Sequence, residues 1–400
     1  MKGKRADQDA GTGVAGGQSA DPVVVGHLYV HIPFCHRICP YCSFHKHQPG
    51  GHDLNGFVEA VLAELDATMA AGLVSLRPET VYFGGGTPSL LASRQIERLI
   101  RGLKERFEVG ACDRAGPAEW SLEANPRTFD LGKARLWREL GVTRVSLGVQ
   151  AWDPDTLRIL GRDHSPAEAA EAYDLLRLAG LPVVSLDLMF SIPGQSLDTW
   201  QRGLRRTIEL KPDHVSTYNL TFEEDTEFLA KHQQGRLPQS EEDNAGCFEL
   251  AMDLLGGAGF EHYEISNHAR PGMRCRHNQA YWRGADYLGL GPGAVSTVGG
   301  HRWRNAPDTR DYTLRGLAGE APQRSPERLT SEQRRLERVA LELRTADGLE
   351  ELHLDPGDGT RRMLDLLVGE GLVTMDAGDR RVRLTRAGRL IADEIAAALA

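Results

Sequence analysis

The sequence predicts an α/β protein, in which a partial (β/α)6 TIM-like barrel is followed by a smaller C-terminal α+β domain that resembles a winged helix. Short apolar runs alternate with longer amphipathic stretches through residues 27–265, which is typical of parallel strands joined by crossover helices. Polar residues or glycines follow most of the short runs. Because the carboxyl ends of barrel strands form the active-site face, these residues predict one functional site there.

Four segments are expected along the chain. Residues 1–26 are rich in Gly, Ala and Asp, lack the apolar core of a secretory signal, and are interpreted as a flexible tail. Residues 27–265 form the barrel, with strands expected at His27–Ile32, Thr80–Phe83, Glu119–Glu123, Arg144–Val149, Val183–Met189 and His214–Leu220, and helices at Gly56–Ala71, Ser93–Phe107, Pro166–Leu178 and Leu197–Leu210. Residues 266–325 connect the barrel to the last domain, with loop and one short helix expected over 299–325. Residues 326–400 are expected to form helix, helix, a two-stranded wing and a last helix.

The composition argues against several classes of partner. The 400 residues carry 47 basic and 56 acidic side chains, a net charge of −9, which does not favour a nucleic-acid partner. Residues 325–400 hold 12 arginines against 15 acidic residues, so a packing or lid role for the winged-helix-like domain is favoured over DNA binding. No apolar run reaches the length of a membrane-spanning helix. Clustered thiols without disulfide-like spacing indicate a reducing, cytoplasmic location.

Three cysteines follow the first predicted strand with the spacing C-x3-C-x2-C: Cys35, Cys39 and Cys42. Three thiolates on one short loop can hold three corners of a [4Fe–4S] cluster and leave the fourth iron open to S-adenosylmethionine (SAM). A structural zinc site is a weaker alternative, because one of His31, His36, His45 or His47 would have to supply the fourth ligand. A c-type haem is excluded since Ser43 follows Cys42, and a Cys39–Cys42 disulfide would leave Cys35 unexplained. Cys112 and Cys247 are interpreted as incidental thiols.

The cysteine loop carries a family resemblance. With Tyr41 between its last two cysteines it resembles the radical SAM superfamily. The preceding run, Tyr29-Val-His-Ile-Pro-Phe-Cys35, resembles the branch that holds oxygen-independent coproporphyrinogen III oxidases and HemW-type haem chaperones. The resemblance covers nearly the whole chain from residue 27 and implies that Tyr29 belongs to the cofactor-binding set. It also implies that the Gly84–Pro88 run contacts the amino end of SAM through Gly85, Gly86 and Thr87.

Four polar residues near strand ends match further SAM-binding positions of that branch: Glu123, Gln150, Arg162 and Asp187. The guanidinium of Arg162 suits a carboxylate, which arginine binds in a bidentate manner. Asp187 lies in an apolar strand, where a charge is costly unless it is paired or binds a ligand. Each residue alone also fits a structural role, and the set as a whole predicts the SAM site.

Two features separate the oxidases from the chaperones. The oxidases carry a further cysteine two residues after the third, and this chain has Phe44 there. HemW-type chaperones carry a His-Asn-x-x-Tyr-Trp motif, which is present here as His277, Tyr281 and Trp282. A neutral imidazole is a good axial ligand of haem iron, and Tyr and Trp offer apolar faces to a macrocycle. These residues alone favour a structural cluster, with His277 bonded to the backbone and Trp282 in the core. The resemblance implies instead a haem ligand at His277 lined by Tyr281 and Trp282, with Cys275 as a nearby thiol.

The resemblance therefore implies a cytoplasmic haem chaperone with a SAM-liganded [4Fe–4S] cluster. Such a protein would take up haem and pass it to acceptor haemoproteins, as a homodimer or with a membrane-associated partner. The alternative is an oxygen-independent coproporphyrinogen III dehydrogenase, in which a 5′-deoxyadenosyl radical starts the decarboxylation of two propionates. The third interpretation of the cysteine motif is a radical SAM enzyme that acts on another substrate.

Overall fold

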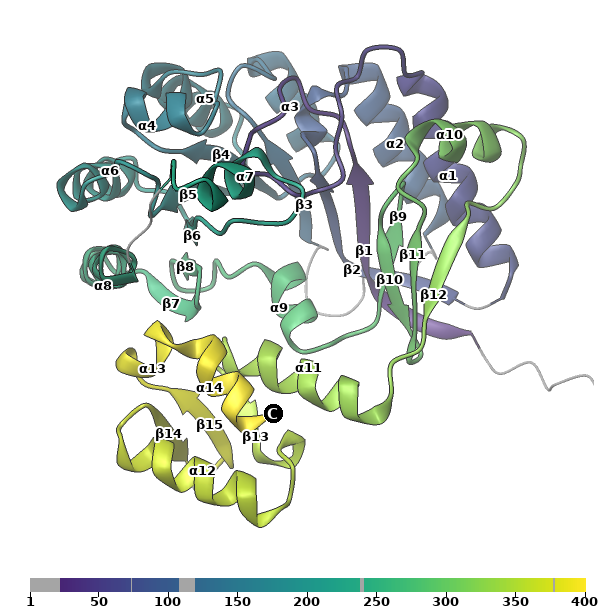
Figure 1. Cartoon of the computed structure of the whole chain (residues 1–400). Coiled ribbons are helices and arrows are strands. Elements are labelled where there is room, and N and C mark those ends of the chain that lie inside the picture. The colour runs from purple at the N-terminus through teal and green to yellow at the C-terminus, as the bar shows by residue number, and fades with distance from the viewer. Residues whose placement is uncertain (1–21, 73, 108–118, 238–240, 377) are drawn as a thin grey trace, which may run out of the picture.

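The computed structural model describes residues 22–72, 74–107, 119–237, 241–376 and 378–400, so most of the expected tail and Cys112 lie outside the described residues. One twisted sheet of twelve strands runs in the order β12-β11-β10-β9-β1-β2-β3-β4-β5-β6-β8-β7 (Figure 1). The six strands that come first along the chain are parallel to one another: β1 (Val23–Ile32), β2 (Val74–Gly85), β3 (Glu119–Ala124), β4 (Arg144–Gln150), β5 (Val183–Phe190) and β6 (His214–Asn219). The six predicted strands are confirmed, with β1 and β2 beginning earlier than expected.

Helices on the outside of these strands cover the sheet (Figure 1). They are α1 (Leu54–Ala70), α2 (Ser93–Arg106), α3 (Leu131–Glu139), α4 (Pro154–Ile159), α5 (Pro166–Leu178), α6 (Leu197–Glu209) and α8 (Glu241–Gly257), with a 3-10 turn η1 (Pro88–Leu90) after β2. Helix α7 (Glu227–Gln233) instead packs against the cysteine loop, where the Phe228 and Tyr41 rings lie 6.1 Å apart. The four predicted helices are confirmed. Capping explains where α5 begins: the Ser165 side chain accepts from the Glu168 amide, and the Glu168 carboxylate accepts from the Ser165 amide.

Both edges of the parallel sheet are extended by shorter strands. The pair β7 (Glu261–Glu264) and β8 (Asn267–Ala269) runs antiparallel beyond β6, and helix α9 (Arg276–Trp282) follows. On the other edge β9 (Tyr287–Leu290) pairs in parallel with β1, and β10 (Val295–Val298), β11 (His301–Asn305) and β12 (Arg324–Glu327) continue antiparallel. The expectation of loop for residues 299–325 was therefore wrong in part. The short helix is present as α10 (Thr309–Leu317), but β11 and β12 are strands whose exposed, arginine-rich faces give no apolar run.

The C-terminal module contains α11 (Ser331–Leu343), β13 (Leu349–Glu350), η2 (Glu351–His353), α12 (Asp358–Gly369), β14 (Val373–Asp376), β15 (Arg381–Leu384), α13 (Arg386–Leu390) and α14 (Ala392–Leu399). Its three strands form a separate antiparallel sheet in the order β13-β15-β14. Val339, Leu343, Val382 and Leu399 are fully buried in a core of its own. The predicted two helices, two-stranded wing (β14 and β15) and final helical segment are present, but β13 adds a third strand to the sheet and the last helix is divided into α13 and α14.

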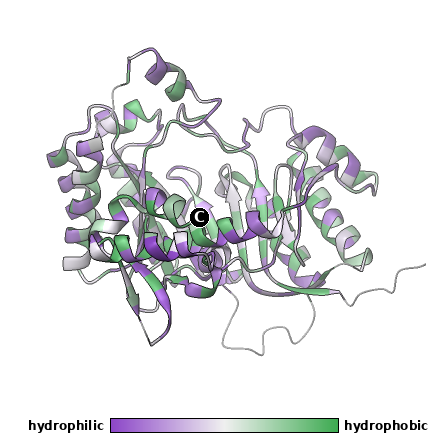
Figure 2. Ribbon diagram, turned by 60° about the horizontal axis from the view of Figure 1, so that its bottom comes forward, coloured by the Kyte–Doolittle hydropathy of each residue, from purple (hydrophilic) through white to green (hydrophobic). Residues whose placement is uncertain are grey.

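Hydrophobic residues of the strands and the inner helix faces form the main core, and hydrophilic residues cover the outer faces of the helices (Figure 2). Within the part of the chain that is described, no helix is long and apolar enough to span a bilayer.

Glu64 of α1 ties the β9–β12 extension to the barrel. Its side chain is 1% exposed and accepts hydrogen bonds from the Tyr312 hydroxyl (2.6 Å), Asn305 Nδ2 (2.7 Å) and the Gly291 amide (2.9 Å). Arg324 Nη2 adds an ion pair at 3.2 Å. Burial raises the pKa of Glu64, and these donors act against that rise. One carboxylate thus joins α1 to the β9–β10 turn, β11, α10 and β12.

Replacing Glu64 should therefore destabilise the fold strongly. In Glu64→Ala the buried donors lose their acceptor, and we expect the free energy of unfolding to fall by about 3–5 kcal/mol in urea titrations. Glu59→Ala on the same helix removes an exposed pair with Arg98 and should cost less than about 1 kcal/mol. Equal losses in the two variants would contradict the role assigned to Glu64.

Candidate functional site

A cavity of about 410 Å³, called the cluster cavity below, lies at the carboxyl ends of β1–β6. It brings together the three cysteines and the predicted SAM-binding residues apart from Tyr29, which it does not include. The lining residues are Cys35, Cys39, Cys42, Gly85, Gly86, Thr87, Glu123, Gln150, Arg162 and Asp187, together with others from the same strands and loops. The prediction that residues distant in the sequence meet at one face of the sheet is confirmed.

The cysteine loop is fixed by the backbone. Phe34 and His47 form a bridge, in which the Cys35 amide donates to His47 O and the His47 amide donates to Pro33 O, each at 2.9 Å. Burial raises the pKa of Cys35 to about 11 and also raises that of Cys42. These thiols would therefore ionise when a metal ion binds to the sulfurs and displaces their protons into the solvent, which couples metal binding to proton release. A soft, three-thiol donor set fits an iron–sulfur cluster.

A chain of hydrogen bonds runs from one cysteine to another. Thr87 Oγ1 donates to Cys35 Sγ at 3.5 Å, and Asn125 Nδ2 donates to Thr87 Oγ1 at 3.0 Å. Arg162 then donates to Asn125 Oδ1 through Nη2 at 2.5 Å and to Cys39 Sγ through Nη1 at 3.8 Å. Donors aimed at cluster sulfurs hold the thiolates in place and raise the reduction potential of such clusters. Thr87 and Arg162 thus contact the cysteines, beyond the SAM contacts predicted for them.

The glycine run is needed for close packing of β2 beneath the cysteine loop. The amides of Gly86 and Thr87 donate to Ile32 O and Phe34 O at 2.8 and 2.7 Å. A Cβ on Gly86 would lie 2.8 Å from Phe34 O, and a Cβ on Gly85, which has φ +107°, would lie 2.4 Å from the His31 ring. The run therefore has a structural role, and it also lines the cavity.

Two carboxylates line the inner part of the cavity without a basic partner at hydrogen-bonding distance. Glu123 accepts from the Tyr82 hydroxyl at 2.9 Å and from the Gly85 amide at 3.1 Å, and burial raises its pKa to about 7. Asp187 accepts from the hydroxyl of Ser146 at 2.8 Å and from that of Ser185 at 3.3 Å, and burial raises its pKa to about 6. A cationic ligand would stabilise both in the ionised form.

Gln150 and Tyr29 are two further residues predicted to bind the cofactor, and Gln150 lines the cavity whereas Tyr29 does not. Gln150 ends β4 after a register shift and has φ +65°, an uncommon conformation for a residue other than glycine. Tyr29 lies one layer below the cavity, where its ring stacks on Tyr82 at 6.2 Å and its hydroxyl bonds to His31 Nδ1 at 3.0 Å. Tyr29 therefore supports the site through Tyr82.

Helix α9 carries the His-Asn-x-x-Tyr-Trp motif at the opposite end of the strands, below the barrel in Figure 1. Glu119 of β3 accepts from the amides of Arg276 and His277, each at 3.1 Å, and pairs with Arg144 of β4 at 3.4 Å. Arg144 Nη2 in turn donates to Met273 O at 2.7 Å. This buried ion pair fixes the start of α9 against the sheet.

His277 is 1% exposed and does not line the cluster cavity. Its Nδ1 bonds to Thr80 Oγ1 at 2.7 Å, its ring stacks on Tyr82 at 5.0 Å, and Tyr281 packs edge-on at 4.8 Å. Its Nε2 is buried without a hydrogen-bond partner among the described residues, and burial lowers its pKa to about 3. The imidazole is therefore neutral. Trp282 lies on another side of α9, in contact with the ring of Tyr263 at 5.8 Å.

Sequence reasoning missed Asn125, Tyr82 and the Glu119–Arg144 pair. Asn125 stands two residues after Glu123, at the end of the same strand, and that position could have marked it. Tyr82 carries no such signal, because its role comes from contacts on two sides: Glu123 above and His277 below.

The raised pKa of Glu123 predicts a pH dependence in protein without its cluster. The folded state holds the carboxyl proton more tightly than the unfolded chain, so this stabilisation is complete below pH 4.5 and is lost as pH rises through about 7. As the pH rises from 4.5 to about 7, the free energy of unfolding of Glu123→Gln should therefore fall by roughly 1–3 kcal/mol less than that of the unmodified chain. Urea titrations across the pH range measure this. Glu97→Gln, at an exposed helix position, should keep the original slope, and an unchanged slope in Glu123→Gln would contradict the prediction.

Comparison with known proteins identifies the family. The radical SAM superfamily matches residues 29–206. The heme chaperone HemW of Mycobacterium tuberculosis is 37% identical over 372 residues, which cover 92% of this chain and 93% of that protein. HemW of Bacillus subtilis is 32% identical over 381 residues, covering 92% and 97%, and HemW of Escherichia coli is 40% identical over 276 residues, covering 68% and 70%.

Among solved structures, the coproporphyrinogen III oxidase HemN from Escherichia coli, described as a radical SAM enzyme, has a TM-score of 0.79 at 25% identity and covers 95% of this chain and 91% of its own. The fold is therefore shared with the oxidase, whereas the higher identities are with HemW proteins. The chain belongs to the HemW family within the radical SAM superfamily.

Proposed function

We propose that this protein is a haem chaperone that holds a SAM-liganded [4Fe–4S] cluster and passes haem to acceptor haemoproteins. The observation that carries the proposal is Phe44, which lines the cluster cavity at the position where the oxidases have a fourth cysteine. The HemW relatives, at 32–40% identity, support the same choice over the oxidase neighbour at 25%. The cytoplasmic location, the homodimer and a membrane-associated acceptor remain predictions.

The residues of the cavity suit a cluster with SAM beside it. Cys35, Cys39 and Cys42 would each hold one iron and leave the fourth iron for the amino and carboxylate groups of SAM. When bound, the cluster could supply an electron that cleaves the sulfonium of SAM. Glu123 and Asp187 are placed to accept from the amino and hydroxyl groups of the ligand, and their ionisation would favour its positive charge.

The haem-binding role of His277 is supported by its chemistry. Thr80 Oγ1 bonds to Nδ1 of both His277 and His27, at 2.7 and 3.0 Å, and its hydroxyl can donate to only one of them. If it donates to His27, then His277 donates its own Nδ1 proton to Thr80 and keeps a free lone pair on Nε2. A neutral imidazole in that form is an axial ligand for iron. Because the side chain is buried, haem reaches it only when α9 moves away from β2.

Removing one cluster cysteine should abolish cluster binding. We expect Cys35→Ala, reconstituted anaerobically with iron and sulfide, to lose the iron, the acid-labile sulfide and the electron paramagnetic resonance signal of the reduced cluster. Cys247→Ala is the matched control, since Cys247 is buried in the core away from the cavity and should leave all three unchanged. Retention of a full cluster in Cys35→Ala would contradict the assignment of this loop.

The two candidate functions differ in a direct assay. Reconstituted protein should bind haem, as shown by its absorption spectrum, and restore activity to an apo-haemoprotein, without forming protoporphyrinogen IX from coproporphyrinogen III. His277→Ala should reduce haem binding, whereas His301→Ala, at an exposed position of β11, should not. Robust decarboxylation without haem transfer would establish the oxidase activity instead and overturn the proposal.

A further inference from the structure

A chain of buried hydrogen bonds leads from the cluster cavity through the barrel to the residue that precedes α9. Asp187, which lines the cavity, accepts from the Ser185 hydroxyl at 3.3 Å, and Ser185 Oγ lies 2.8 Å from His214 Nδ1. His214 Nε2 lies 2.7 Å from the Tyr263 hydroxyl oxygen, which accepts from the Cys275 amide at 3.2 Å. The SAM site predicted from the sequence includes Asp187 but none of the side chains behind it.

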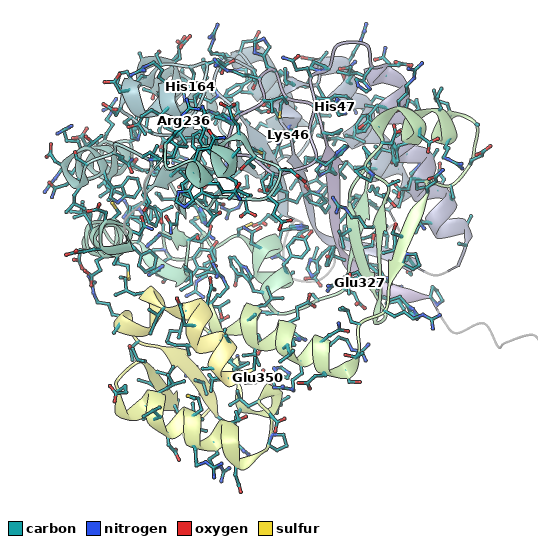
Figure 3. All side chains as sticks on the ribbon, viewed as in Figure 1. Lys46, His47, His164, Arg236, Glu327 and Glu350 are labelled. Carbon is teal, nitrogen blue, oxygen red and sulfur yellow. The ribbon has the colours of Figure 1, made fainter. Side chains whose placement is uncertain are left out.

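This chain of hydrogen bonds runs from the cluster cavity toward the opposite end of the strands. Figure 3 gives the direction: Lys46 of the cluster cavity lies in the upper part of the molecule, and Glu350 of the C-terminal module lies near its lower end. Ser185, His214 and Tyr263 come from β5, β6 and β7, and each is 2% exposed. Because water does not compete for these hydrogen bonds, the three side chains are held in line behind one cavity carboxylate.

The groups at the two ends favour one direction of donation along the chain. The Cys275 amide can only donate, so the Tyr263 oxygen accepts there and the hydroxyl proton is left for His214 Nε2. An ionised Asp187 can only accept, so Ser185 donates to it and accepts from His214 Nδ1. Burial lowers the pKa of His214 and raises that of Tyr263, so both side chains are neutral. A neutral His214 with its proton on Nδ1 satisfies all of these hydrogen bonds together.

This direction of donation suits the ionised form of Asp187. The hydroxyls of Ser146 and Ser185 can both donate to a carboxylate, whereas a protonated carboxyl has to donate to a neighbour itself. Donors aimed at the charged form lower the pKa of a carboxyl, and here they act against burial, which raises the pKa of Asp187 to about 6. The chain therefore supports the negative charge that a cationic ligand would need at this position.

Other polar groups also surround Asp187 and His214. Those that face Asp187 from the neighbouring strands are Ser146, Ser216, Arg144, Glu123, Tyr82 and Tyr218. Arg144 also faces His214, and so does His268, whose pKa burial lowers. Among these groups Glu123 is the one that titrates near Asp187, because burial raises its pKa to about 7. A test that uses pH must therefore identify which change belongs to Asp187.

We propose that His214 and Tyr263 are positioning residues of the SAM site, which act through Ser185 to keep Asp187 ionised and oriented toward the amino or hydroxyl groups of SAM. The inference rests on the proposed function, because that function places SAM in the cluster cavity. It adds to the site two side chains that lie outside the lining of the cavity and act on the ligand through another residue.

The test measures SAM binding by anaerobic equilibrium dialysis between about pH 5 and 7.5, with the full chain and its reconstituted, oxidised cluster. The unmodified chain should bind SAM more tightly as the pH rises through about 6, and Asp187→Asn should lose that step. Tyr263→Phe and Ser185→Ala break the chain on either side of His214. In both, the step should move up by about half a pH unit or more, so that SAM binds roughly two- to five-fold more weakly near pH 6. At about pH 7.5, above the moved step, both should bind SAM nearly as tightly as the unmodified chain.

Tyr173→Phe is the matched control, because it also removes a buried hydroxyl, one on α5 that donates to Leu210 O at 2.7 Å. It should follow the unmodified chain at every pH, and thermal unfolding and iron content verify that each variant is folded and holds its cluster. If Tyr263→Phe and Ser185→Ala also follow the unmodified chain, or bind SAM more weakly by one factor at every pH, the positioning role is wrong and the SAM site stands. If the unmodified chain with its cluster does not bind SAM, the proposed function fails at this site and the positioning role fails with it.

Discussion

The buried ion pair between Glu119 and Arg144 determines how the two ends of the barrel are used. Both side chains come from the amino-terminal ends of neighbouring strands, where a lone charge would be very costly. Together they satisfy the first amides of α9 and the carbonyl of Met273, and so fix that helix across the lower opening. The cluster cavity lies at the other end, where the strands have their carboxyl ends.

Tyr82 connects the chemistry on the two sides of this arrangement. Its hydroxyl donates to Glu123 in the cluster cavity, while its ring stacks on His277 below. A change in the charge of Glu123 therefore acts on a side chain that also packs against the motif histidine. Through Tyr82, the cluster cavity and the His-Asn-x-x-Tyr-Trp motif are neighbours inside the barrel, although their residues are about 150 positions apart in the sequence.

Much of this could be predicted from the sequence, for physical reasons. Strands β3–β5 are buried at most positions on both faces and therefore appear as short, largely apolar runs, and capping residues such as Ser165 mark where helices begin. The cavity residues follow those runs directly. What could not be predicted depends on partners far along the chain: Glu64 meets Arg324, and Glu119 meets His277. The short strands β11 and β12 have exposed faces and no apolar pattern, and the face of α9 on which Trp282 lies is decided only by packing against Tyr263.

Phe44 has a consequence for the redox properties of a bound cluster. The residue lines the cluster cavity and is 68% exposed, so water reaches the cavity beside the cysteine loop. The reduction potential of an iron–sulfur cluster depends on its exposure to solvent and on hydrogen bonds to its sulfurs. An opening at Phe44 would therefore act on the potential of a cluster held by the three cysteines, together with the donors Thr87 and Arg162.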